Sequence, residues 1–150
     1  MIQRIQSLYL LIVTILLICT LFLPIGYFVD GEMVSHPFRA LGVKTIPDQP
    51  IETWGLFALL FLSTIVSVAT IFLFKNRILQ IRMTTFNCLL IVGFYIVYGF
   101  FVYMITKEID LTFRLAMGLS LPLISLILNY LAIRAIGKDE FLVKAADRIR

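Results

Sequence analysis

The chain has 150 residues, of which 61% are hydrophobic and only 15% are charged, with a formal net charge of +4. Soluble domains are about 45–50% apolar and about 25% charged. A soluble fold of this size must expose a large share of its residues to water, so this composition excludes one and predicts a membrane protein. The length suffices for one domain, and we predict a single integral membrane domain over residues 1–150.

Four apolar runs without Asp, Glu or Lys follow one another along the chain, at residues 7–28, 54–74, 85–106 and 115–136. About 20 apolar residues in a helix span the ~30 Å hydrocarbon core, and lipid cannot satisfy the backbone groups of open strands. We therefore predict an all-α membrane protein with four transmembrane helices. Short connections make neighbouring helices antiparallel, which favours an up-and-down bundle.

The first run could instead be a secretory signal, because Arg4 precedes it. Its apolar stretch is longer than the ~7–15 residues of a signal peptide, and residues 21–28 hold no cleavage site of the A-x-A kind. We predict that it is an uncleaved first helix.

The connection 29–53 is the largest polar segment between the runs, and we predict a small β-hairpin in it. Asp30 and Gly31 lie between β-prone residues at positions 28–34, which is a short-range hairpin signal. Three prolines then follow and are expected to interrupt regular structure, namely Pro37, Pro47 and Pro50.

Basic residues are distributed unequally between the two sides of the predicted bundle. One side carries nine basic and three acidic residues, and the other carries four basic and six acidic residues, so the two sides hold +6 and −2, which sum to +4. Because Lys and Arg are enriched in cytoplasmic loops, we predict that the first side is cytoplasmic and that both chain ends lie there. Its basic residues are Arg4, Lys75, Arg77, Arg82, Arg134, Lys138, Lys144, Arg148 and Arg150.

The last residues are predicted to form a short, separate amphipathic helix on the cytoplasmic side. Gly137 is a typical end for the fourth helix, and Asp139 can cap a new one. A helix this short is marginal alone in water, so we expect it to pack against the interface, the connector 75–82 or a partner. Its apolar residues recur at helical spacing, at Phe141, Leu142, Ala145, Ala146 and Ile149.

Asn87 and Asn129 are the most deeply placed strongly polar residues of the predicted spans. Ionisable groups, which transporters and proton relays use at membrane depth, are missing from the middle of every run. An asparagine can hydrogen-bond across helices, at about 0.6 kcal/mol on average, so we predict intramembrane polar contacts that stabilise the bundle. Pro122 is expected to kink the fourth helix.

The sequence shows no catalytic, metal-binding or cofactor-binding constellation, which predicts a protein that needs no cofactor and is not an enzyme. Cys19 and Cys88 lie singly in apolar runs, without a CxxC pair. His36 is the sole histidine, which excludes bis-histidine haem ligation within one chain. We expect it to be a solvated loop residue.

The connector 75–82, KNRILQIR, is the densest chemical feature of the sequence. Such charges determine topology in any membrane protein, and that role alone suffices to explain them. They can also bind an anionic lipid head group or an acidic partner surface. Nucleic acid is not expected, because the basic stretch is short and lacks interleaved aromatic residues. The candidate contact residues for a partner or an anionic lipid are Lys75, Arg77, Arg82, Lys138, Lys144, Arg148 and Arg150.

Three stretches carry a resemblance to a known family: MIQRIQSLYL at the start, FKNRILQIR at the connector and LAIRAIGKDEFLVKAADRIR at the end. Together they resemble the bacterial inner-membrane family catalogued as domain of unknown function 4293. The resemblance implies a four-helix protein of the bacterial inner membrane, and it assigns no activity, ligand or catalytic residue.

Three functions from different classes are compatible with these features. The first is a non-enzymatic scaffold or accessory subunit of a larger inner-membrane assembly, docking through the cytoplasmic connector and tail. The second is a small oligomeric transporter or channel, with Asn87, Asn129 and Pro122 in its wall. The third is a membrane enzyme acting on lipid, with His36 or the loop carboxylates as acid–base groups. The lack of ionisable groups inside the spans favours the first.

Overall fold

A computed structural model describes residues 2–43 and 51–149 of the chain. Within them lie four long helices, α1 (Ile2–Phe22), α2 (Trp54–Phe72), α3 (Arg77–Ile109) and α4 (Ser120–Ile149), and a short 3-10 helix, η1 (Met117–Leu119). All four long helices are long and apolar enough to cross a membrane, which confirms the prediction of four helices capable of spanning one. The prediction of a single domain stays a prediction.

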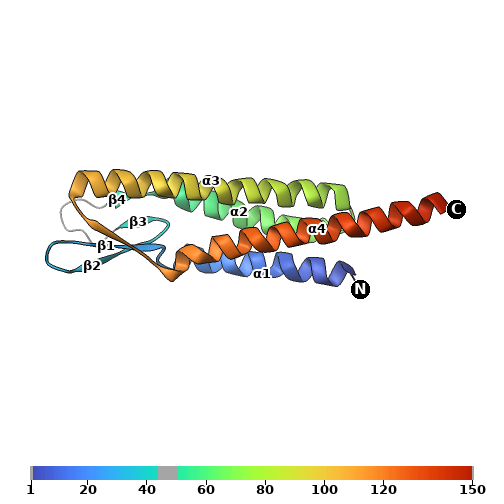
Figure 1. The fold of residues 1–150 in the computed structure, drawn as a ribbon, viewed down its shortest axis with the longest axis horizontal. Helices are drawn as coiled ribbons and strands as arrows, with labels where there is room; N and C mark the ends of the chain where they lie inside the picture. The colour runs from blue at the N-terminus through green and yellow to red at the C-terminus, as the bar shows by residue number, and fades with distance from the viewer. Residues whose placement is uncertain (1, 44–50, 150) are drawn as a thin grey trace.

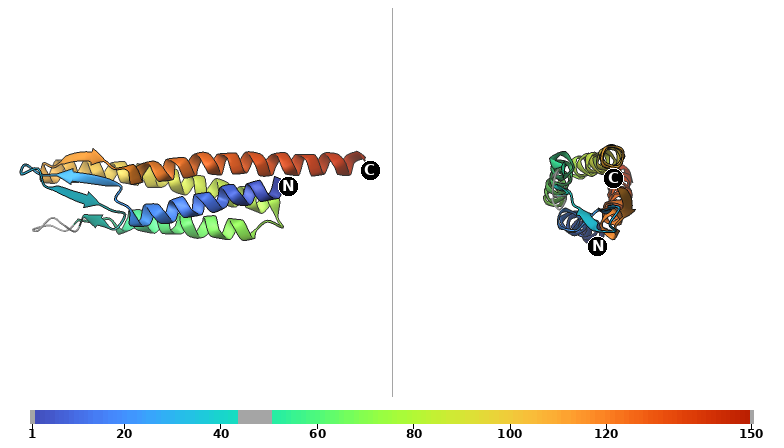
Figure 2. Two further views of the ribbon diagram at one scale, coloured as in Figure 1. Left: turned by 90° about the horizontal axis from the view of Figure 1, so that it is seen from below. Right: turned by 90° about the vertical axis from the view of Figure 1, so that its left-hand side faces the viewer.

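Each long helix packs against two others: α1 and α3 each contact both α2 and α4. The helices lie side by side along the long axis of the molecule, as Figures 1 and 2 show. Ile2 and Ile149 belong to one end of this arrangement, which we call the terminal end. The strands occupy the opposite end, which we call the ribbon end.

The ribbon end contains two small antiparallel sheets. The first has three strands in the order β2-β1-β5, formed by β1 (Gly26–Val29), β2 (Ser35–Phe38) and β5 (Thr112–Leu115). The second pairs β3 (Gly42–Val43) with β4 (Ile51–Glu52). The predicted hairpin is confirmed as β1–β2. The strand β5 was not predicted; it belongs to the connection between α3 and α4 and pairs with β1 in the connection between α1 and α2.

Asp30 organises the turn of the β1–β2 hairpin. Its carboxylate oxygen Oδ1 accepts hydrogen bonds from the backbone amides of Glu32 at 2.9 Å and Val34 at 3.1 Å. These bonds favour the charged carboxylate, the Val34 bond most strongly, and they lower the pKa of Asp30. Met33 takes the left-handed conformation that closes the turn, with a φ of 62°.

The predicted first span was too long at its ribbon end. The helix α1 ends at Phe22, and residues 26–28 of the predicted span belong to β1. Pro24 explains the early end, because proline disfavours helical geometry at the residue before it and cannot donate to the preceding turn. Pro37 also differs from expectation, since it lies within β2. β2 is an edge strand, where a missing amide is tolerated. Pro47 and Pro50 lie outside the described residues.

The predicted break in the fourth helix is wrong. α4 continues through Gly137 and Asp139 to Ile149, so the expected separate tail helix is an extension of α4. Gly137 does not adopt the left-handed conformation that ends helices at glycine. A glycine inside a helix costs about 0.5–1 kcal/mol relative to alanine, which the flanking helix-forming residues outweigh.

The predicted kink at Pro122 also needs correction. Pro122 is the third residue of α4 and therefore lies in its first turn. The first four amides of a helix have no partner within the helix, so proline costs little at such a position. Pro122 marks the start of α4 instead of bending its middle.

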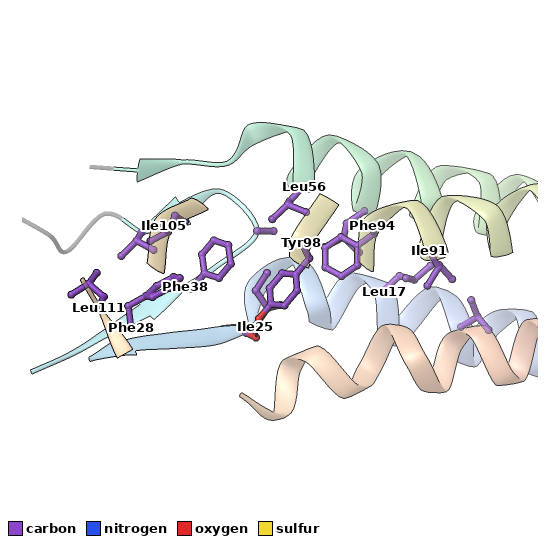
Figure 3. Packing of buried hydrophobic residues seen from close by; sticks show 14 residues of the cluster. Leu17, Ile25, Phe28, Phe38, Leu56, Ile91, Phe94, Tyr98, Ile105 and Leu111 are labelled. Carbon is purple, nitrogen blue, oxygen red and sulfur yellow. Dashed lines mark hydrogen bonds between the residues drawn. The ribbon is translucent and has the colours of Figure 1, made fainter. Parts of the chain in front are cut away.

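The hydrophobic core is concentrated toward the ribbon end. Figure 3 shows Phe28, Phe38, Phe94 and Tyr98 packed between the sheet and the helices. The Tyr98 hydroxyl donates to the carbonyl of Ile25 at 2.8 Å, which ties α3 to the start of β1. Aromatic packing thus fixes the three-stranded sheet onto the bundle.

Candidate functional site

The interior of the bundle becomes polar toward the terminal end. The Thr14 and Ser67 hydroxyls lie 2.8 Å apart between α1 and α2. The Gln80 amide donates to the carbonyl of Thr70 at 3.2 Å, and the Gln6 amide donates to the carbonyl of Ala135 at 3.2 Å. These bonds link neighbouring helices in the part of the bundle that has no aromatic core.

Asn87 and Asn129 are almost fully buried in this polar interior. The Ser63 hydroxyl donates to Oδ1 of Asn87, so α2 and α3 are joined at this level. Asn129 makes no hydrogen bond to any described residue through either amide atom, and Nδ2 of Asn87 has no such partner either. The cross-helix hydrogen bond expected of Asn129 is therefore not made within the described part of the chain.

Asn87 and Asn129 lie at the same level of two neighbouring helices. One contact between α3 and α4 joins Arg77 to Asp139, and another joins Tyr95 to the Leu119 carbonyl just before α4. Asn87 is ten residues after Arg77, and Asn129 is ten residues before Asp139. Because both helices rise equally per residue, the two asparagine side chains lie at the same height in the bundle. Three of their polar atoms have no partner among the described residues, namely Nδ2 of Asn87 and both amide atoms of Asn129.

An open groove at the terminal end gathers four of the predicted contact residues. Its volume is about 820 Å³, and it lies between α4 beyond Gly137 on one side and the α2–α3 connection with the first two turns of α3 on the other. Lys75, Arg77, Arg82 and Lys144 supply its positive charges. The apolar residues lining it are Phe74, Ile78, Leu79 and Val143. The groove therefore combines cations with exposed hydrocarbon.

Two of these four cations have acidic neighbours. Nη2 of Arg77 lies 3.3 Å from Oδ2 of Asp139, a charge contact without hydrogen-bond geometry. Nζ of Lys144 lies 3.1 Å from Oε1 of Glu140, one helical turn away. Ion pairs this close to the surface contribute about 0–1 kcal/mol. Lys75 and Arg82 form no ion pair within residues 2–43 and 51–149.

The last part of α4, residues 137–149, projects past the other helices, and we call it the α4 extension (Figure 1). At 3.6 residues per turn, Asp139, Glu140, Val143 and Asp147 continue the stripe that is buried earlier in α4. The opposite side, which we call the outer stripe, consists of Lys138, Phe141, Leu142, Ala145, Arg148 and Ile149. Phe141 is 71% exposed and Ile149 is 87% exposed. The extension thus presents uncovered apolar groups flanked by cations.

The seven predicted contact residues therefore separate into two places. Lys75, Arg77, Arg82 and Lys144 line the groove, whereas Lys138 and Arg148 lie on the outer stripe. Arg150 lies outside the described residues. Sequence reasoning missed the roles of Asp139 and Glu140, which neutralise groove cations. If α4 had been predicted to continue through Gly137, its helical periodicity would have placed Asp139 and Glu140 on the face directed toward the basic residues of segment 75–82.

His36 is not the solvated loop residue that was expected. It lies in β2, is 7% exposed, and its Nε2 is 3.4 Å from Oδ2 of Asp30. No cluster of three or more His, Cys, Asp or Glu residues suited to a metal is found among the described residues. His36 is thus part of the hairpin packing.

A family model described as "Domain of unknown function (DUF4293)" matches residues 2–149. This match includes the three stretches that carried the resemblance, apart from Met1 and Arg150, and it confirms the resemblance to this family. No curated protein matches the chain.

Proposed function

We propose a function for this chain, which belongs to the family described as domain of unknown function (DUF4293), from the geometry of its terminal end. It is a non-enzymatic protein of a bacterial inner membrane, an antiparallel up-and-down bundle of four spans with both termini in the cytoplasm. It acts as a scaffold or accessory subunit of a larger membrane assembly. The observation that carries this proposal is the exposed apolar outer stripe on the α4 extension.

The distribution of charge supports the cytoplasmic assignment of the terminal end. Nine of the thirteen basic residues belong to this side, and three of the nine acidic residues accompany them. An excess of Lys and Arg in short connections marks the cytoplasmic face of membrane proteins. The groove and the α4 extension consequently face the cytoplasm.

The direction of the α4 extension favours a protein partner over the lipid surface. The helix continues along the bundle axis, so Ile149 lies about 18 Å beyond Gly137 at the usual rise per residue. The polar layer of a bilayer adds only about 5–8 Å on each side of the hydrocarbon. Ile149 therefore lies too far out to be buried in lipid. Its natural partner is a cytoplasmic protein surface with apolar residues and acidic groups, which match Ile149 and Arg148 at the far end of the outer stripe.

Replacing Phe141 and Ile149 together with serine is expected to reduce recovery of partner proteins about tenfold. Large apolar residues at the centre of an interface contribute most of its binding energy, and both side chains are exposed without a partner chain. The measurement is quantitative mass spectrometry of proteins that copurify with the tagged chain from native membranes in mild detergent.

The matched control replaces Met33 and Val34 with serine at the ribbon end. Met33 is 89% exposed, so this pair removes comparable exposed hydrocarbon from the opposite side. We expect its partner recovery to equal that of the unaltered chain. Repeated recovery of the unaltered chain alone at native expression, or equal losses for both double variants, would contradict docking through the outer stripe.

One observation favours a second function, a small oligomeric transporter or channel. Asn129 and Asn87 hold buried polar atoms without described partners at one level of the bundle. Such atoms can line a hydrated path when two or more copies meet. The lack of an ionisable group at that level makes this the weaker proposal.

A further inference from the structure

The cation-lined groove at the terminal end has the composition of a site for an amphipathic anion. Its cations are Lys75, Arg77, Arg82 and Lys144, and Glu140 is the acid among the lining residues. Asp139 neutralises Arg77 and Glu140 neutralises Lys144, so the four cations of the groove have two acidic partners. A net charge of about +2 remains, and it resides on Lys75 and Arg82.

Apolar side chains adjoin these two cations. Phe74 and Ile78 are both more than half exposed. Phe74 directly precedes Lys75, and Ile78 lies one helical turn before Arg82 in α3. Hydrocarbon left uncovered beside unpaired cations fits a ligand that carries an anionic head and an apolar chain together. An acidic peptide or a free phosphate would satisfy the cations and leave Phe74 and Ile78 uncovered.

The position of the groove identifies the source of such a ligand. The apolar part of α2 ends at Phe72, and the groove begins two residues later at Phe74. This is the depth at which the head groups of one leaflet meet the hydrocarbon. The volume of about 820 Å³ accommodates a phospholipid head group with the first part of its chains. Basic pockets between membrane helices on the cytoplasmic side recognise anionic head groups in this way.

We propose that this groove binds one anionic phospholipid of the cytoplasmic leaflet, whose phosphate lies between Lys75 and Arg82 and whose chains cover Phe74 and Ile78. The assignment to the cytoplasmic leaflet rests on the proposed orientation of the chain. The α4 extension forms the far wall of the groove through Glu140, Val143 and Lys144. The lipid would therefore contact the inner side of the same helix whose outer stripe is free for a partner.

The test compares lipid retention by two double variants that lose the same charge. Lys75→Gln with Arg82→Gln removes the unpaired groove cations. Lys138→Gln with Arg148→Gln removes two cations of the same end that do not line the groove. The full chain is placed in phosphatidylcholine nanodiscs containing graded amounts of phosphatidylglycerol, and retained anionic lipid is counted by native mass spectrometry.

To retain the same amount of anionic lipid, the groove variant is expected to need about fivefold more phosphatidylglycerol for each cation removed. We expect the control variant to retain as much anionic lipid as the unaltered chain. Equal losses in both variants would show a diffuse surface charge effect and overturn the proposal. So would unchanged retention in the groove variant. Displacement of the lipid by the same concentration of glycerol phosphate would show that phosphate alone is recognised, which also contradicts the amphipathic site.

This experiment is independent of the proposed scaffold function. Both leaflets of the nanodisc have the same composition, so the result does not depend on which side is cytoplasmic. Lys75 and Arg82 are exposed, so their replacement should leave the melting temperature unchanged, which a thermal scan verifies. Loss of lipid with normal partner recovery, or the converse, separates the two proposals.

Discussion

Replacing Tyr98 with alanine is expected to lower the free energy of unfolding by about 3–5 kcal/mol, the range for deleting a large buried aromatic side chain. Tyr98 is 5% exposed and stacks on Phe38 of β2, with ring centroids 5.6 Å apart. It also contacts Phe94 of α3 and Phe113 of β5. The substitution should therefore loosen the sheets from the helices as well as open a cavity. The measurement is equilibrium unfolding in bicelles, followed by circular dichroism.

Tyr98→Phe is the control for this prediction. It keeps the ring and removes only the hydroxyl that donates to the Ile25 carbonyl, so we expect a loss of about 0.5–1.5 kcal/mol. Proteolysis at the ribbon end should increase in the alanine variant and remain near normal in the phenylalanine variant. A Tyr98→Ala variant no less stable than Tyr98→Phe would show that the aromatic cluster does not hold the sheets in place.

Replacing Asn129 with leucine is expected to raise the stability of the bundle by about 1–3 kcal/mol, measured in the same bicelles. A buried amide without a partner carries a desolvation cost of this size, and leucine has the same number of side-chain heavy atoms, branched at the same carbon. From the sequence alone we predicted that Asn129 stabilises the bundle through a polar contact across helices, which would make its replacement destabilising. The structure reverses the expected sign, since neither amide atom has a described partner.

Asn87→Leu is the matched comparison at the same level. It removes the acceptor of the Ser63 hydroxyl, so we expect no gain in stability from it. A clear loss in the Asn129→Leu variant would mean that its amide is bonded in the membrane, to water or to a second copy of the chain. That outcome would favour the transporter alternative. A gain accompanied by normal partner recovery would favour the scaffold.

Hydropathy and charge predicted the coarse architecture because both signals are spread over many residues. Four runs of about 20 apolar residues identify the helices whatever their exact ends, and the Asp30-Gly31 pair identified the hairpin. The element ends depended on single residues and were less reliable. Pro24 ended α1 several residues before its apolar run stopped. Gly137 failed to end α4, because a glycine signal is weak inside a strongly helical sequence.

Long-range contacts could not be predicted from the sequence. β5 pairs with β1 across more than 80 residues, through a segment with no turn signal of its own. His36 became buried because it lies on the same face of β2 as the core residue Phe38. The candidate contact residues were chosen because they are basic and lie on one predicted side of the membrane. Only the structure shows that Lys75 and Arg82 line the groove, whereas Lys138 and Arg148 lie on the outer stripe.

The orientation of the bundle is the premise on which the proposed docking surface depends, and cysteine labelling tests it directly. In a chain with Cys19→Ser and Cys88→Ser, single cysteines are introduced as Glu32→Cys at the ribbon end and Lys138→Cys at the terminal end, both at exposed positions. We predict that a membrane-impermeant maleimide labels the Glu32→Cys variant in intact spheroplasts and labels the Lys138→Cys variant only after permeabilisation. Labelling of the Lys138→Cys variant in intact spheroplasts would place the groove and the α4 extension outside the cytoplasm and contradict the account.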